Sequence, residues 1–83
     1  MQRERLTLAR IAAFNCPEGE KQAFIWDTEA PRLAVRATAG AKSFIFDTKL
    51  NRQTIRRTIG DVKNWNIDAA REEARRLQTL IDK

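Results

Sequence analysis

A chain of 83 residues with a net charge of +5 can form one small domain, whose core is too small to surround a deep active-site cleft. It has no histidine and no tyrosine, and its one cysteine, Cys16, permits no internal disulfide. These features argue against an enzyme, a zinc site and a disulfide-rich secreted domain, and they favour a cytoplasmic binding module with no cofactor or metal.

The positive charge is concentrated in the middle of the chain. Residues 32–63 carry eight lysines and arginines against two acids, a net charge of +6. The net charge is −1 for residues 1–31 and zero for residues 64–83. Such localised charge indicates a polyanionic partner, and DNA or RNA is the first candidate.

The first third of the chain predicts a short helix followed by a short strand. Thr7 can cap a helix over residues 8–14, and the proline and glycine among residues 15–19 end it. Residues 24–27 are typical of a strand. In so small a domain we expect the aromatic side chains of this strand, Phe24 and Trp26, to lie in the core.

Three antiparallel strands are predicted from Arg32 onward, where apolar and polar residues begin to alternate. They cover residues 32–38, 43–50 and 54–59, with turns at residues 39–42 and 51–53. Arg57 shares the inward parity, and we expect its stem to pack at a sheet edge while its head stays in water. The other predicted inward residues are Leu33, Val35, Ala37, Phe44, Phe46, Leu50, Ile55 and Ile59.

An amphipathic helix is predicted over residues 67–81, capped by Asn66, with Trp65 closing the end of the core. Its arginines, Arg71, Arg75 and Arg76, are expected to face solvent and to pair with Asp68 and Glu72. The predicted fold is therefore α+β: a three-stranded antiparallel sheet packed on a carboxy-terminal helix, with a short amino-terminal helix and a short extra strand.

Five segments of the chain fall together in the order and spacing of one family. They are Phe-Ile-Trp-Asp at 24–27, Pro-Arg-Leu-Ala-Val-Arg-Ala-Thr at 31–38, Gly-Ala-Lys-Ser-Phe-Ile-Phe at 40–46, Arg-Thr-Ile-Gly at 57–60 and Ile-Asp-Ala-Ala-Arg-Glu-Glu-Ala at 67–74. In these segments the chain resembles the amino-terminal arm-type DNA-binding domain of prophage and genomic-island integrases, which are tyrosine recombinases. It departs from the family pattern at Arg52, where a glycine often follows Asn51, and at Asp61, where a basic residue is common.

The resemblance implies a single arm-binding domain over residues 1–83, whose open sheet face enters the major groove of double-stranded DNA at arm sites. It also implies that the natural protein continues past Lys83 into further integrase domains that perform the recombination and meet other subunits. We expect the isolated domain to be a monomer and to carry no catalytic residue of its own.

The predicted DNA-binding residues follow from strand parity and turn position. Arg36 and Arg56 can each donate two hydrogen bonds to a guanine, whereas Lys42 and Arg52 lie in turns, where phosphates would flank an inserted sheet. Ile45 is either a contact for a thymine methyl group or an ordinary exposed apolar residue. The full predicted set is Arg36, Thr38, Lys42, Ser43, Ile45, Lys49, Arg52, Thr54, Arg56 and Thr58.

Two other functions fit the same sequence. An RNA or single-stranded nucleic-acid binding module would need aromatic side chains that stack on exposed bases, so it would be favoured if Phe44 and Phe46 faced solvent. A basic protein-interaction domain would instead dock an acidic partner on the sheet, and the cations would then be an ordinary solvated surface.

Overall fold

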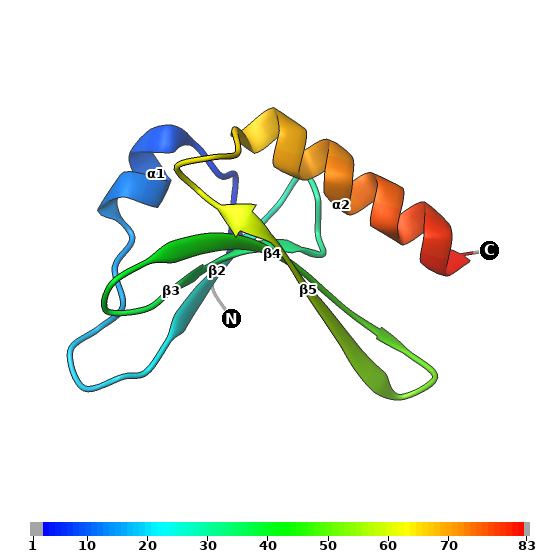
Figure 1. Ribbon diagram of the computed structural model, residues 1–83, viewed down its shortest axis with the longest axis horizontal. Coiled ribbons are helices and arrows are strands. Elements are labelled where there is room, and N and C mark those ends of the chain that lie inside the picture. Colours follow the sequence, from blue (N-terminus) through cyan, green and yellow to red (C-terminus); the bar gives the residue numbers. More distant parts are fainter. Residues whose placement is uncertain (1–2, 83) are drawn as a thin grey trace.

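The computed structural model describes residues 3–82, which form a single sheet covered on one side by two helices (Figure 1). The sheet order is β1-β2-β3-β4-β5, with β1 parallel to β2 and every other pair antiparallel. The strands are β1 (Arg3–Glu4), β2 (Ala23–Asp27), β3 (Leu33–Ala37), β4 (Lys42–Leu50) and β5 (Gln53–Asp61), and the helices are α1 (Leu8–Ala13) and α2 (Ile67–Asp82).

The α+β class and the carboxy-terminal helix are confirmed, but the prediction of three antiparallel strands is wrong. The short strand β2 does not stand apart from the sheet. It pairs with β3 from Ala23 opposite Ala37 to Trp26 opposite Ala34, which makes four antiparallel strands, and the two residues of β1 extend its edge. The wider sheet gives more backbone donors and acceptors a partner than three strands would.

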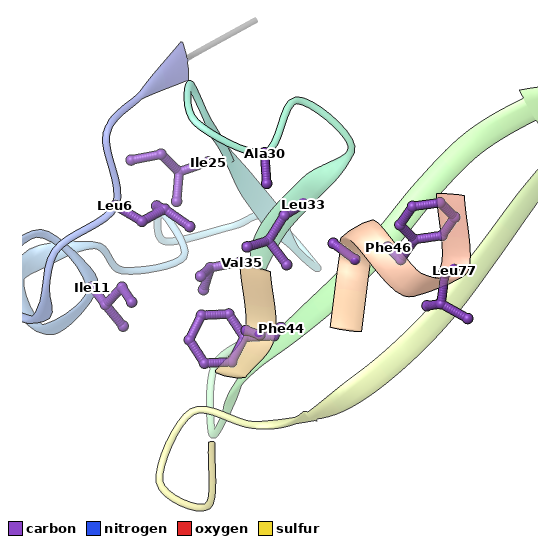
Figure 2. Packing of buried hydrophobic residues seen from close by; sticks show 11 residues of the cluster. Leu6, Ile11, Ile25, Ala30, Leu33, Val35, Phe44, Phe46 and Leu77 are labelled. Atoms are coloured by element: carbon purple, nitrogen blue, oxygen red, sulfur yellow. The ribbon is translucent and has the colours of Figure 1, made fainter. Parts of the chain in front are cut away.

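The core lies between the sheet and the helices, on what we call the inner face (Figure 2). Phe44 and Phe46 of β4 are each 1% exposed, and they pack with apolar residues of β2, β3, α1 and α2. The predicted inward parity is confirmed for these residues and for Leu33 and Val35. The opposite face of the sheet, which we call the outer face, carries neither helix.

Both helices begin where the sequence predicts. The Thr7 hydroxyl accepts a hydrogen bond of 3.1 Å from the backbone amide of Arg10, and the Asn66 side chain accepts one of 2.7 Å from Ala69. Trp65 packs against the core cluster, as expected of a residue that closes its end. Its indole lies so close to Gly60 that a side-chain carbon at that position would overlap it.

The β4–β5 hairpin is longer than the rest of the sheet and projects beyond it (Figure 1). Its turn contains two residues, because Leu50 pairs with Gln53. Asn51 and Arg52 have φ angles of 51° and 69°, the pair of positive values that a type I′ turn requires. The chain thus makes the tight turn even though Arg52 stands where glycine is favoured.

A buried ion pair that the sequence did not predict joins α2 to β2. The expected solvent exposure of Arg71 is wrong, although its Nη1 atom does lie 3.8 Å from the expected partner Asp68. Arg71 is 6% exposed instead of facing solvent, and its guanidinium donates hydrogen bonds to both carboxylate oxygens of Asp27, at 2.7 and 3.3 Å, and to the Leu6 carbonyl at 3.0 Å. The pairing expected between Glu72 and Arg76 is also wrong, because Arg76 pairs with Glu73.

Candidate nucleic-acid interface

The strand register places most of the predicted binding residues together on the outer face. Ile45 of β4 lies opposite Thr58, and Lys49 lies opposite Thr54, so these side chains share a face that points away from Phe44 and Phe46. A bulge at Ile59 shifts the register beyond Thr58, because Phe44 pairs with Gly60. By this register the outer face holds Arg36, Ser43, Ile45, Lys49, Thr54, Arg56 and Thr58 from the predicted set, and also Phe24, Trp26, Ala34, Asp47 and Asp61.

The expectation that Phe24 and Trp26 lie in the core is wrong. Both alternate with Ile25, which is buried on the inner face, so they lie half-buried on the outer face. Their rings stack with centroids 6.4 Å apart, and the guanidinium carbon of Arg56 lies 5.0 Å from the centre of the Phe24 ring. These three side chains form what we call the outer cluster.

The outer cluster explains why Ile45 is not exposed. Phe24 and Arg56 come from β2 and β5, which are separated by β3 and β4, or about 14 Å of sheet. Their contact therefore passes above the two strands between them, where Ala34 and Ile45 are each 0% exposed. The expected exposure of Ile45 is thus wrong, and this side chain has no surface to offer to a base.

Arg56 is held in place from a second direction. Its Nε and Nη2 atoms donate hydrogen bonds of 3.0 and 2.6 Å to the same carboxylate oxygen of Asp47, the residue opposite it on β4. The Asp47 side chain is 11% exposed and that of Arg56 is 39% exposed, so the arginine lies over the acid and faces solvent. An exposed arginine with one fixed orientation can recognise a planar partner better than a freely rotating one.

The tip of the hairpin carries the densest positive charge. Residues 49–57, which we call the hairpin tip, contain four cations and no acid, and all of them except Ile55 are exposed. Lys49 and Arg56 lie on its outer face, Arg52 lies in the turn, and Arg57 lies on the inner side opposite Phe46, with an exposed side chain as predicted. The hairpin tip is thus an exposed, positively charged two-stranded ribbon.

Not all of the predicted residues belong to this surface. Lys42 lies in β4 and not in a turn, and its ammonium donates hydrogen bonds of 2.7 and 3.1 Å to the carbonyls of Ile11 and Ala12 in α1. Thr38 lies just past β3, where its hydroxyl donates to the Ala41 carbonyl at 3.3 Å. Both residues stand beside a groove of about 430 Å³ on the helix side of the sheet.

The charge of residues 32–63 is therefore divided between the two faces. Strand positions of the outer face hold three of the eight cations and both acids, Asp47 and Asp61, for a net charge of +1. Arg32 does not add to the charge of this face, since its guanidinium donates a 2.7 Å hydrogen bond to the Thr48 hydroxyl. The excess positive charge is thus concentrated at the hairpin tip instead of being spread over the sheet.

The structure shows neither a metal centre nor a membrane helix in the part of the chain that it describes. Within residues 3–82, no group of three or more histidine, cysteine or acidic residues could hold a metal ion. No helix in the same range is long and apolar enough to cross a membrane.

Comparisons with known proteins show the family of this chain. The chain is 51% identical over 82 residues to Prophage integrase IntF of Escherichia coli (strain K12), an alignment that covers 99% of this chain and 18% of that relative. The chain thus spans less than a fifth of the length of this relative. No solved structure matches the chain. A family model described as "Arm DNA-binding domain" matches residues 6–83, and the chain therefore belongs to the arm DNA-binding domain family.

Proposed function

We propose that this domain binds double-stranded DNA by inserting the outer face of the β4–β5 hairpin into the major groove. The observation that carries this proposal is the hairpin tip, a projecting two-stranded ribbon with four cations and no acid. The major groove of B-DNA is about 12 Å wide and admits a two-stranded ribbon. The helices do not obstruct insertion, because both lie on the inner face.

Each outer residue has a proposed role that follows from its place on the outer face. Lys49 and Arg52 lie at and beside the turn, where they would meet the phosphates at the groove walls and fix the orientation of the domain. Arg36 lies in β3 beside the hairpin and Arg56 lies in β5, both on outer strand positions from which a guanidinium would reach base edges. The hydroxyl groups of Ser43, Thr54 and Thr58 complete the proposed surface, whereas Thr38, Lys42 and Ile45 stay out of it because of their positions and contacts.

We further propose that the domain is the targeting part of a site-specific recombinase that integrates a prophage or genomic island. The name of the relative, a prophage integrase, supports this role. Recombination of the tyrosine type needs a tyrosine nucleophile, which these 83 residues do not contain, so other domains of such a protein would perform it. This domain would bring the reaction to arm sites.

Single-stranded nucleic acid is a weaker candidate for the ligand. Phe44 and Phe46 are each 1% exposed and cannot stack on bases. Phe24 and Trp26 are accessible in part, but the Phe24 ring already packs against Trp26 and Arg56. A competition assay with a single-stranded oligonucleotide of equal length distinguishes the two ligands, and the proposal predicts preference for the duplex.

The salt dependence of binding tests the proposed phosphate contacts. For a 20-base-pair duplex of arbitrary sequence, four to six such contacts give a plot of log affinity against log salt a slope of about −4 to −5. Replacing one phosphate-binding cation, as in Lys49→Ala or Arg52→Ala, should make this slope shallower by about one unit. Fluorescence anisotropy titrations at several salt concentrations measure the slope.

Arg75→Ala is the matched control, because Arg75 is an exposed arginine of α2 on the helix side of the sheet. It removes the same charge from the protein but should leave the slope unchanged. Equal effects of Arg75→Ala and Arg52→Ala would mean that only the overall charge matters, and a slope near zero for the unmodified domain would contradict electrostatic binding altogether.

A further inference from the structure

The contact between Asp47 and Arg56 determines which edge of the guanidinium is occupied and which can bind another group. One carboxylate oxygen of Asp47 accepts from both Nε and Nη2, so the edge formed by these two nitrogens is occupied. The Phe24 ring packs against the guanidinium at 5.0 Å. Arg56 is thereby restrained both by a carboxylate and by an aromatic ring.

The edge that remains is suited to one base. A guanidinium has five N–H groups, and after the bonds to Asp47 the fork formed by Nη1 and Nη2 still has a parallel pair of donors. Guanine is the base that presents two acceptors, O6 and N7, side by side in the major groove. Adenine presents one donor and one acceptor there, which does not match a fork that only donates.

An acid on a DNA-binding surface also has an electrostatic cost. Asp47 repels phosphates, and a surface selected only for affinity for DNA would gain from its removal. Its 2.6 Å contact with Arg56 gives the carboxylate a different use, because it restricts the arginine to one orientation before any DNA arrives. The expected result is selectivity among bases at the expense of general affinity.

We propose that Asp47 is a positioning residue that orients Arg56 to recognise a guanine in the major groove. This inference rests on the proposed binding of duplex DNA by the outer face. It adds a specificity determinant that does not itself touch the DNA, since Asp47 acts through Arg56.

The test compares variants by selection from a library of duplexes with a randomised 20-base-pair centre. The unmodified domain should enrich a motif, and Arg56→Ala should lose the guanine preference at one position of that motif. Asp47→Asn should lower the preference at the same position by roughly tenfold, within the range of roughly 5- to 150-fold that a bidentate arginine provides. The same variant should bind the unselected library more tightly than the unmodified domain does, because it has lost a negative charge.

Asp61→Asn is the matched control, since Asp61 is the other acid on the outer face and lies opposite Ser43, away from Arg56. It should bind the unselected library more tightly but keep the full guanine preference. Arg56→Lys is a second test that leaves Asp47 intact: the lysine keeps the charge but has no fork, so the preference should fall while affinity for unselected duplexes persists. Melting temperatures confirm beforehand that each variant is folded.

The outcomes separate the two proposals. A domain that enriches no duplex at all would overturn both the proposed function and this inference. A motif that Arg56→Ala or Arg56→Lys leaves intact, or a guanine preference that Asp47→Asn retains in full, would overturn the inference alone, and the outer face would then bind DNA without an oriented Arg56.

Discussion

Asp27→Asn is expected to lower the free energy of unfolding by about 3–5 kcal/mol, a large part of the stability of so small a domain. Asp27 is 0% exposed, and its partner Arg71 is 6% exposed. The substitution would remove the only fully buried carboxylate that pairs with the guanidinium among the described residues, and would leave it with the more exposed carboxylates of Glu29 at 3.3 Å and Asp68 at 3.8 Å. It would also weaken the site where the Asp27 oxygens accept from the backbone amides of Leu6, Glu29 and Ala30, which hold the loop after β2 and the segment before α1.

Urea denaturation measures this loss, and Glu73→Gln provides the control. Glu73 pairs with Arg76 on the surface of α2, at 2.7 Å, and the Arg76 side chain is 60% exposed. Solvent screens this pair, so its loss should have a far smaller effect. If Asp27→Asn and Glu73→Gln lowered the free energy of unfolding by equally small amounts, the ion pair between Asp27 and Arg71 would not be what stabilises the packing of α2 on β2.

The same pair predicts how stability depends on pH. Burial alone would raise the pKa of Asp27, but hydrogen bonds from Arg71, Leu6 and Glu29 outweigh it and hold the pKa below its ordinary value of 3.8. As the pH falls below about 4, the unfolded chain therefore takes up the proton before the folded domain does, and the contribution of Asp27 to stability is lost. Above that pH the contribution is complete. Asp27→Asn should remove this part of the acid sensitivity.

Ile45→Ala is expected to destabilise the domain by about 2–5 kcal/mol, even though Ile45 faces away from the helices. The side chain is 0% exposed beneath the outer cluster, so its truncation leaves a cavity under Phe24, Trp26 and Arg56. An exposed apolar residue on a strand would show almost no such effect.

Thr58→Ala is the control for this prediction, since Thr58 lies opposite Ile45 on the same face but is exposed. It should change the midpoint of thermal unfolding only slightly, whereas Ile45→Ala should lower it by several degrees for each kcal/mol lost. Similar melting temperatures for Ile45→Ala and the unmodified domain would mean that the outer cluster does not cover Ile45.

Local patterns in the sequence predicted most of the fold. Alternation placed Phe44 and Phe46 inward, and the capping residues Thr7 and Asn66 marked both helix starts. These features depend on residues close together in the chain. The pairing of Asp27 with Arg71 joins residues 44 positions apart. Arg71 lies beside the apolar stripe of α2, four residues after Ile67, but this helical spacing does not identify Asp27 as its partner.

The candidate site was harder to predict, because strand parity gives the face on which a residue lies but not whether other side chains cover it. Ile45 has outward parity, and only the four-strand register shows that Phe24 and Arg56 meet above it. The proposed role of Asp47 depends on the number of residues in the turn between β4 and β5. A three-residue turn at 51–53 would place Asp47 opposite Arg57, whereas the observed two-residue turn places it opposite Arg56.

Mapping of amide chemical shifts by NMR during titration with a DNA duplex would show directly which face of the domain binds. Insertion of the hairpin predicts the largest changes within residues 47–58, with smaller ones at Arg36 and Ser43 of the outer face. Residues that line the groove beside α1, such as Leu8 and Trp65, should change little. Changes confined to that groove or to α2, with the hairpin tip unaffected, would contradict binding through the outer face.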